Sequence, residues 1–124
     1  MNLLQLHHVQ ITIPKGNEDR ARAFYCGVLG LREIPKPESL AGRGGFWLEL
    51  GDGQVHIGIE DRIDRGRSKA HVAYLVDDLD SWRSRLAAIN IEAIDGLPIP
   101  GYDRFEFRDP FGNRVELLAE IARR

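Results

Sequence analysis

The chain repeats one short strand-like pattern. Residues 8–13 read His-Val-Gln-Ile-Thr-Ile, and residues 71–76 read His-Val-Ala-Tyr-Leu-Val. In both segments a histidine comes first and apolar residues then recur at every second position, as in a half-buried β-strand. Each copy is followed by a polar helix start, an amphipathic helix and three further strand-like runs. Repetition at this scale indicates duplicated supersecondary units, so an account of function has to explain why a histidine opens each copy.

The sequence predicts a single domain, residues 1–124, built from two βαβββ units. The first unit is expected at about residues 6–60 and the second at about residues 70–120, with a charge-rich linker at residues 61–69. Strands of the first unit are expected at residues 6–13, 31–34, 46–50 and 54–60. Strands of the second unit are expected at residues 71–76, 91–94, 105–108 and 114–119. The breaker-rich segments 35–45 and 95–104 are expected to be matching loops.

Each predicted helix has recognisable start and stop signals. Asn17 and the pair Asp77-Asp78 are residue types that cap helix N-termini. Gly30 and Asn90 stand where a helix usually ends in the left-handed conformation. The buried stripes are expected to be Ala21, Phe24, Tyr25 and Val28 in the first helix, and Leu79, Trp82, Leu86 and Ile89 in the second.

Charge and composition exclude several classes of partner. A net charge of −2 gives no electrostatic footprint for nucleic acid or for an anionic membrane. No apolar run approaches the length of a membrane span. The N-terminus has no signal-peptide pattern, and the single cysteine, Cys26, fits a reducing compartment. We therefore expect a cytoplasmic protein whose partner is a small molecule, and neither a nucleic acid nor a membrane.

Four polar side chains occupy repeat-related strand positions. His8 and His71 open the first strand of each unit, and alignment of the two units places Glu116 where the first unit has His56. Each of the four alternates with aliphatic neighbours along its strand. All four are therefore predicted to point away from the faces that the helices cover.

These residue types are ligands for a divalent metal ion. Neutral imidazole and carboxylate suit Zn²⁺, Fe²⁺, Mn²⁺, Co²⁺ or Ni²⁺. Two histidines and one carboxylate leave coordination positions open for substrate or water, and a fourth ligand still leaves room around a six-coordinate ion. A single strand histidine is usually solvated or hydrogen-bonded internally, but four such residues at symmetric positions favour a metal site. We predict that His8, His56, His71 and Glu116 form it.

Four segments also resemble a known family. They are residues 8–13, residues 24–31 (Phe-Tyr-Cys-Gly-Val-Leu-Gly-Leu), residues 71–78 and residues 109–116 (Asp-Pro-Phe-Gly-Asn-Arg-Val-Glu). The chain resembles the vicinal oxygen chelate superfamily, which includes glyoxalase I, extradiol dioxygenases, fosfomycin-resistance enzymes, methylmalonyl-CoA epimerase and bleomycin-resistance proteins. Among its members the chain is most similar to the small glyoxalase-like proteins without assigned activity.

The resemblance implies an α+β fold in which two βαβββ modules form a curved mixed sheet, with a metal on the concave face and helices on the convex side. The metal would be held by His8, His56, His71 and Glu116, and would chelate adjacent oxygens of the substrate as a Lewis acid. Glu116 and His56 are the expected catalytic residues, in an isomerase, lyase or dioxygenase reaction. Glyoxalase I typically has a glutamate where this chain has His56. The alternative is a non-catalytic protein that binds a small molecule or drug, as resistance relatives do.

Three residues of the two matching loops are candidates for substrate binding. They are Arg43 in the first loop, and Tyr102 and Arg104 in the second. An arginine there is able to hold a substrate carboxylate through two hydrogen bonds, although a solvated loop charge is the commoner role. A homodimer is expected by resemblance. The cup is formed either within one chain or by exchange of modules between two chains.

Overall fold

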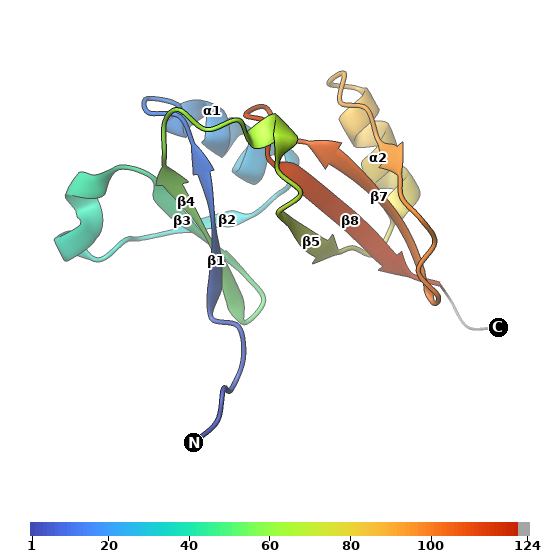
Figure 1. Ribbon diagram of the computed structural model, residues 1–124, viewed down its shortest axis with the longest axis horizontal. Helices are drawn as coiled ribbons and strands as arrows, with labels where there is room; N and C mark the ends of the chain where they lie inside the picture. The colour runs from blue at the N-terminus through green and yellow to red at the C-terminus, as the bar shows by residue number, and fades with distance from the viewer. Residues whose placement is uncertain (122–124) are drawn as a thin grey trace. The chain divides into compact units, whose positions relative to one another are not determined.

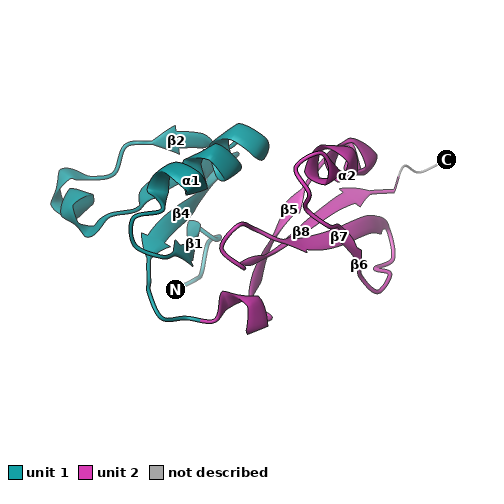
Figure 2. Ribbon diagram, turned by 90° about the horizontal axis from the view of Figure 1, so that it is seen from above, with its two compact units in different colours: residues 1–63 teal, residues 64–124 magenta. Residues whose placement is uncertain are grey.

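The computed structural model describes residues 1–121 and divides into two compact units, Met1–Ile63 and Asp64–Arg124 (Figures 1 and 2). Unit 1 contains β1 (His8–Ile13), α1 (Glu18–Arg22), the π-helix η1 (Ala23–Val28), β2 (Arg32–Ile34), the 3₁₀-helix η2 (Glu38–Arg43), β3 (Phe46–Leu50) and β4 (Gly53–Ile59). Unit 2 contains the 3₁₀-helix η3 (Arg65–Arg67), β5 (His71–Leu75), α2 (Leu79–Ala87), β6 (Ile94–Asp95), β7 (Tyr102–Arg108) and β8 (Arg114–Glu120).

The two units have the same strand order. Unit 1 forms a four-stranded sheet in the order β1-β4-β3-β2, and unit 2 forms one in the order β5-β8-β7-β6. In each sheet the first and last strands of the unit pair in parallel, and the other neighbours are antiparallel. The predicted α+β fold of two βαβββ modules is confirmed, with the strands hydrogen-bonded as two separate four-stranded sheets.

The register of the parallel pairs is also duplicated. Gln10 lies opposite His56 in unit 1, and Ala73 lies opposite Glu116 in unit 2. His8 lies two residues before Gln10, and His71 lies two residues before Ala73. Residues two apart on a strand point to the same face, so each unit brings its histidine to the same face as His56 or Glu116.

The opposite face of each sheet is apolar and is covered by the helix of that unit (Figure 2). In unit 1 the side chains of Val55 and Ile57 on β4 are buried, together with Ala21, Phe24 and Tyr25 from the helical segment. Burying one such aliphatic or aromatic side chain contributes about 1.5–3 kcal/mol. The helix therefore stabilises one face of the sheet and leaves the other face available.

Each helix is joined to its sheet by an equivalent arginine. The Arg22 guanidinium lies 4.6 Å from the ring centroid of Phe46, and its Nε donates to Glu33 Oε1 on β2 at 2.8 Å. In unit 2 the Arg83 guanidinium lies 4.8 Å from the ring centroid of Phe105, and its Nη2 donates to Asp95 on β6 at 3.0 Å. The duplication thus extends from backbone topology to a cation–π contact and an ion pair.

Most of the predicted helix signals are confirmed. Gly30 and Asn90 have positive φ angles of 81° and 62°, as expected for left-handed helix ends. The Asp78 side chain accepts a hydrogen bond from the Ser81 backbone N–H at 3.1 Å, whereas Asn17 occupies the N-cap position without a side-chain cap bond. Ile89 was wrongly assigned to the buried stripe, because it lies beyond the end of α2 and its exposure is 45%.

Three strand boundaries differ from the prediction. β1 begins at His8 rather than at residue 6. The strand expected at 91–94 shrinks to Ile94–Asp95, because the Ile91 N–H instead closes the end of α2 by bonding to the Leu86 carbonyl at 3.0 Å. β7 begins at Tyr102, since β8 extends to Glu120 and supplies partners for it. Tyr102 and Arg104 consequently lie in a strand and not in a loop. None of the helices within residues 1–121 is both long and apolar enough to cross a membrane.

The turn between β7 and β8 depends on the buried carboxylate of Asp109. Its Oδ1 accepts hydrogen bonds from the backbone N–H groups of Phe111 and Asn113 at 2.9 and 2.8 Å, and its Oδ2 accepts one from Asn113 Nδ2 at 2.9 Å. We predict that Asp109→Ala lowers the free energy of unfolding by about 2–3 kcal/mol, because buried donors lose an ionised acceptor. Urea denaturation measures this. Asp103→Ala, at an exposed position of β7, is the matched control and should change stability by less than about 0.5 kcal/mol. Equal effects of the two substitutions would contradict the assignment.

Candidate functional site

In unit 1, His8 and His56 lie side by side on the face away from the helix. Their rings stack with centroids 4.0 Å apart and an interplanar angle of 14°. The Trp47 ring stacks on the other side of His56, with centroids 4.0 Å apart and planes 5° from parallel. The result is a three-ring stack across β1, β4 and β3, with His56 in the middle and buried. The structure therefore brings together the two metal-site candidates of the first module.

Burial and neighbouring charge keep His56 neutral. Burial lowers the pKa of His56 from its ordinary 6.5 to about 4, and the charges of His8, His7 and Lys36 act in the same direction. His56 Nε2 lies 2.8 Å from Gln54 Oε1, which accepts hydrogen bonds only, so the proton is on Nε2 and the lone pair is on Nδ1. His8 Nδ1 lies 3.0 Å from His7 Nδ1. At neutral pH the imidazole of His56 is thus in the form that binds metal.

In unit 2, His71 and Glu116 face one another. The distance between His71 Nε2 and Glu116 Oε1 is 3.6 Å. His71 Nδ1 lies 2.9 Å from the Lys69 carbonyl oxygen, so Nδ1 carries the proton in the neutral ring and Nε2 presents its lone pair. A backbone carbonyl that fixes the tautomer in this way is the usual outer partner of a metal-binding histidine. The second predicted pair is therefore also brought together.

Arg104 forms an ion pair with Glu116. Its Nη1 donates to Glu116 Oε1 at 2.8 Å, and its Nε donates to the Leu97 carbonyl at 2.9 Å. The exposed fractions of the two side chains are 16% for Arg104 and 7% for Glu116. Gly96 leaves room for this guanidinium, because a Cβ at position 96 would lie 2.8 Å from its central carbon. Arg104 therefore neutralises Glu116 and holds one of its two oxygens.

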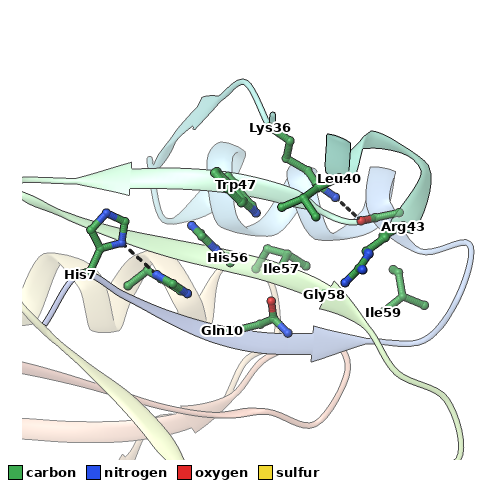
Figure 3. A pocket seen from close by; sticks show the side chains of 12 residues that line it. His7, Gln10, Lys36, Leu40, Arg43, Trp47, His56, Ile57, Gly58 and Ile59 are labelled. Atoms are coloured by element: carbon green, nitrogen blue, oxygen red, sulfur yellow. Dashed lines mark hydrogen bonds between the residues drawn. The ribbon is translucent and has the colours of Figure 1, made fainter. Parts of the chain in front are cut away.

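A cavity of about 600 Å³ in unit 1 opens beside the stacked rings (Figure 3). His8, His56 and Trp47 line it, and so do the side chains of Lys36 and Arg43. Lys36 Nζ donates to the Gly44 carbonyl at 2.7 Å, which holds it at the rim. The structure thus places Arg43 in the same cavity as the two imidazoles.

The other two candidates for substrate binding lie in unit 2. Tyr102 and Arg104 line a hollow of about 460 Å³ whose remaining lining includes several carboxylates, among them Asp77, Asp95 and Asp103. Arg104 extends from this hollow to Glu116, whereas no contact of Tyr102 with His71 or Glu116 is present among residues 1–121. Tyr102 is therefore not brought to the predicted metal ligands.

Each unit brings together two side chains of types that bind divalent metal ions. Two atoms that both lie about 2.0–2.2 Å from one ion are at most about 4.4 Å apart, and the 3.6 Å between His71 Nε2 and Glu116 Oε1 satisfies this limit. Imidazole lone pairs lie in the ring plane, so joint binding by His8 and His56 requires one ring to turn out of the stack. His8 is exposed and has room to turn. Within residues 1–121 no three His, Cys, Asp or Glu side chains are grouped closely enough to hold an ion.

Some contacts of the site were missed in the sequence. Trp47 and Gln54 both touch His56, and the alternation of apolar residues along the strands does not predict either contact. The β3–β4 hairpin has a two-residue loop, since Leu50 pairs with Gly53, and this register places Trp47 opposite His56. Counting from a two-residue loop at Gly51-Asp52 would have found that pairing.

Comparisons with known proteins identify the family. The model of the glyoxalase/bleomycin resistance protein/dioxygenase superfamily matches residues 5–117. The chain belongs to this superfamily. Among curated proteins, none matches the chain in sequence.

Several solved structures share the fold of this chain along nearly its whole length. A glyoxalase family protein from Bacillus anthracis is 41% identical, with a TM-score of 0.88 over 98% of this chain and 99% of that one. The fosfomycin resistance protein FosX from Listeria monocytogenes is 18% identical, with a TM-score of 0.75 over 97% and 96% of the two chains. Lactoylglutathione lyase from Agrobacterium tumefaciens is 22% identical, with a TM-score of 0.70 over 93% and 92%. The last two share the fold with this chain. Their sequence identity is too low to assign their activities to it.

The lowered pKa of His56 predicts a pH dependence of stability. Between pH 6.5 and about 4 the unfolded chain binds a proton at His56 that the folded chain does not. The free energy of unfolding should therefore fall as the pH is lowered through this window, by up to about 1.4 kcal/mol per pH unit from this group. Urea denaturation of metal-free protein at several pH values measures the slope. His56→Gln should flatten it, and Lys15→Gln, at an exposed cation that does not act on His56, should not. An unchanged slope in His56→Gln would show that the pKa of His56 is not lowered by folding.

Proposed function

We propose that the protein is a metal-dependent enzyme of the glyoxalase type that acts on a small molecule with two adjacent oxygens. The proposed ligands of one divalent ion are His8, His56, His71 and Glu116. The observation that carries the proposal is the second pair. Lys69 fixes the tautomer of His71 so that an unprotonated nitrogen faces a carboxylate oxygen at 3.6 Å. Two acceptors that face one another in this way are stabilised by a cation between them.

Two further observations support the metal. Members of the superfamily typically bind divalent metal ions, and the first module has a neutral, buried imidazole in His56 whose outer nitrogen is hydrogen-bonded to Gln54. Metal-binding histidines usually have such an outer partner, which orients the ring. Zinc, iron, manganese, nickel and cobalt all accept this donor set.

The bound ion would supply Lewis acidity, polarising the adjacent oxygens of the substrate. The chain itself supplies a base and a holding group. Among residues 1–121, Glu116 Oε2 accepts no hydrogen bond, whereas Oε1 is held by Arg104. Oε2 is therefore the atom that is placed to take a proton from a carbon next to those oxygens, as a lyase or isomerase requires. Arg104 keeps the carboxylate oriented, and His56, neutral at pH 7, is a second group able to accept a proton.

One observation favours the alternative of a non-catalytic binding protein. Arg104 already neutralises Glu116 within unit 2, at 2.8 Å and with little exposure of either group. A carboxylate that is permanently held by an arginine needs no metal. In that case the cavity of unit 1 would sequester a ligand without chemistry, and the histidines would contribute only stacking and hydrogen bonds.

Metal content of untagged protein separates the two readings. We predict near-stoichiometric zinc, iron, manganese, nickel or cobalt by elemental analysis, and a loss of at least about tenfold in metal affinity in His71→Ala, because one of four ligands is removed. Asp103→Ala is the control, since it removes an exposed carboxylate of β7 that is not one of the four proposed ligands. It should retain the metal.

A metal-free wild-type protein that also fails to bind added divalent ions in a titration would contradict the enzyme and support the binding protein. Equal metal content in His71→Ala and in the wild type would have the same meaning, provided that circular dichroism shows His71→Ala to be folded.

We further propose that the protein works as a homodimer in the cytoplasm. A single free cysteine, Cys26, is in keeping with a reducing compartment. Light scattering of the purified protein tests the dimer directly.

A further inference from the structure

We propose that the cavity of unit 1 binds the acid group of an anionic small molecule, a phosphonate or carboxylate, through Lys36 and Arg43. The ligand would place its oxygen-bearing remainder against His8 and His56. The ligand's role as the substrate rests on the function proposed above. The binding itself requires only unit 1, without any metal.

The charge of the cavity supports an anion. Lys36 and Arg43 are part of its lining, and no Asp or Glu of the described chain is. Lys36 uses one of its three donors on the Gly44 carbonyl and keeps two. Among residues 1–121, Arg43 makes no hydrogen bond or ion pair, so its planar donor group is available for an oxyanion. The carboxylate of Glu18, which is not part of the lining, accepts a hydrogen bond from the Gly45 N–H at 3.4 Å.

A comparison of the two units explains why the cavity is open. Gly45 precedes Phe46 on β3 as Arg104 precedes Phe105 on β7, and Phe46 and Phe105 occupy equivalent places in the two sheets. In unit 2 the Arg104 side chain fills this position and neutralises Glu116. In unit 1 a side chain at residue 45 is excluded, because its Cβ would lie 2.0 Å from the Ile57 carbonyl oxygen. Unit 1 thus leaves empty the space that an internal cation occupies in unit 2.

The shape of the cavity determines the orientation of the ligand. Gly58 forms part of the lining two residues after His56 on β4, and the Gln10 amide lies above it, 2.8 Å from a Cβ built at residue 58. Residues two apart on a strand are about 6.8 Å apart. In Figure 3 His7 lies toward one end of the cavity and Arg43 toward the other, with His56 between them. A small acid therefore reaches the cations with one end and the imidazoles with the other.

Phenylphosphonate and the neutral benzamide, which has no acid group, are the probes. Protein depleted of metal on a chelating resin is titrated with each in Tris buffer, and the backbone signals of Gly44 and Gly58 and the indole signal of Trp47 are followed by NMR. We expect saturable shifts with phenylphosphonate and none with benzamide. Arg43→Gln should weaken phenylphosphonate binding by about tenfold, the loss of one charge-assisted contact. Lys15→Gln, an exposed cation of unit 1 outside the cavity, should leave it within about twofold.

A second variant tests the place of binding without removing charge. Gly58→Leu fills the cavity against Gln10, a flexible side chain that is able to move, and should abolish the shifts. Equal binding of both probes, or unchanged phenylphosphonate affinity in Arg43→Gln or in folded Gly58→Leu, would overturn the proposal. Because no metal is present, these outcomes are independent of whether the four proposed ligands bind an ion. Failure of the proposed function would instead appear as absence of metal with phosphonate binding intact.

Discussion

The parallel pairing of the first and last strand within each unit is the constraint on which the site depends. Parallel neighbours need a long connection, and here the helix and two intervening strands provide it in both units. This pairing puts Gln10 opposite His56 and Ala73 opposite Glu116. As a result, His8 stacks on His56 in unit 1, and His71 Nε2 faces Glu116 Oε1 at 3.6 Å in unit 2. The helix covers the other face, so the polar pair remains reachable.

Duplication of the fold has not produced two equal sites. The last-strand position carries an imidazole in unit 1 and a carboxylate in unit 2, and the surroundings differ accordingly. His56 lies between Trp47 and His8 and stays neutral because of its burial. Glu116 forms an ion pair with Arg104. One unit therefore offers neutral donors and an open cationic cavity, and the other offers a negative oxygen with its own counter-ion.

Much of this was predictable because alternation fixes which face a strand residue occupies. His8, His56, His71 and Glu116 were assigned from period two and from alignment of the repeats, and the registers reproduce that alignment. Side-chain partners were not predictable in the same way. The stacking of Trp47 on His56 depends on the length of one hairpin loop, and the Arg104–Glu116 pair depends on a strand that began three residues earlier than its apolar pattern suggested. Ile89 failed because helical spacing continues past the residue where α2 ends.

We propose that His8, His56, His71 and Glu116 hold one metal ion. Anomalous diffraction from crystals of the zinc-loaded protein, collected on both sides of the zinc absorption edge, tests it most directly. The account predicts a single anomalous peak bonded to His8, His56, His71 and Glu116, with Arg104 still hydrogen-bonded to the carboxylate or moved away from it. A zinc peak on other residues would contradict it, and so would the absence of any zinc peak in crystals soaked in excess zinc.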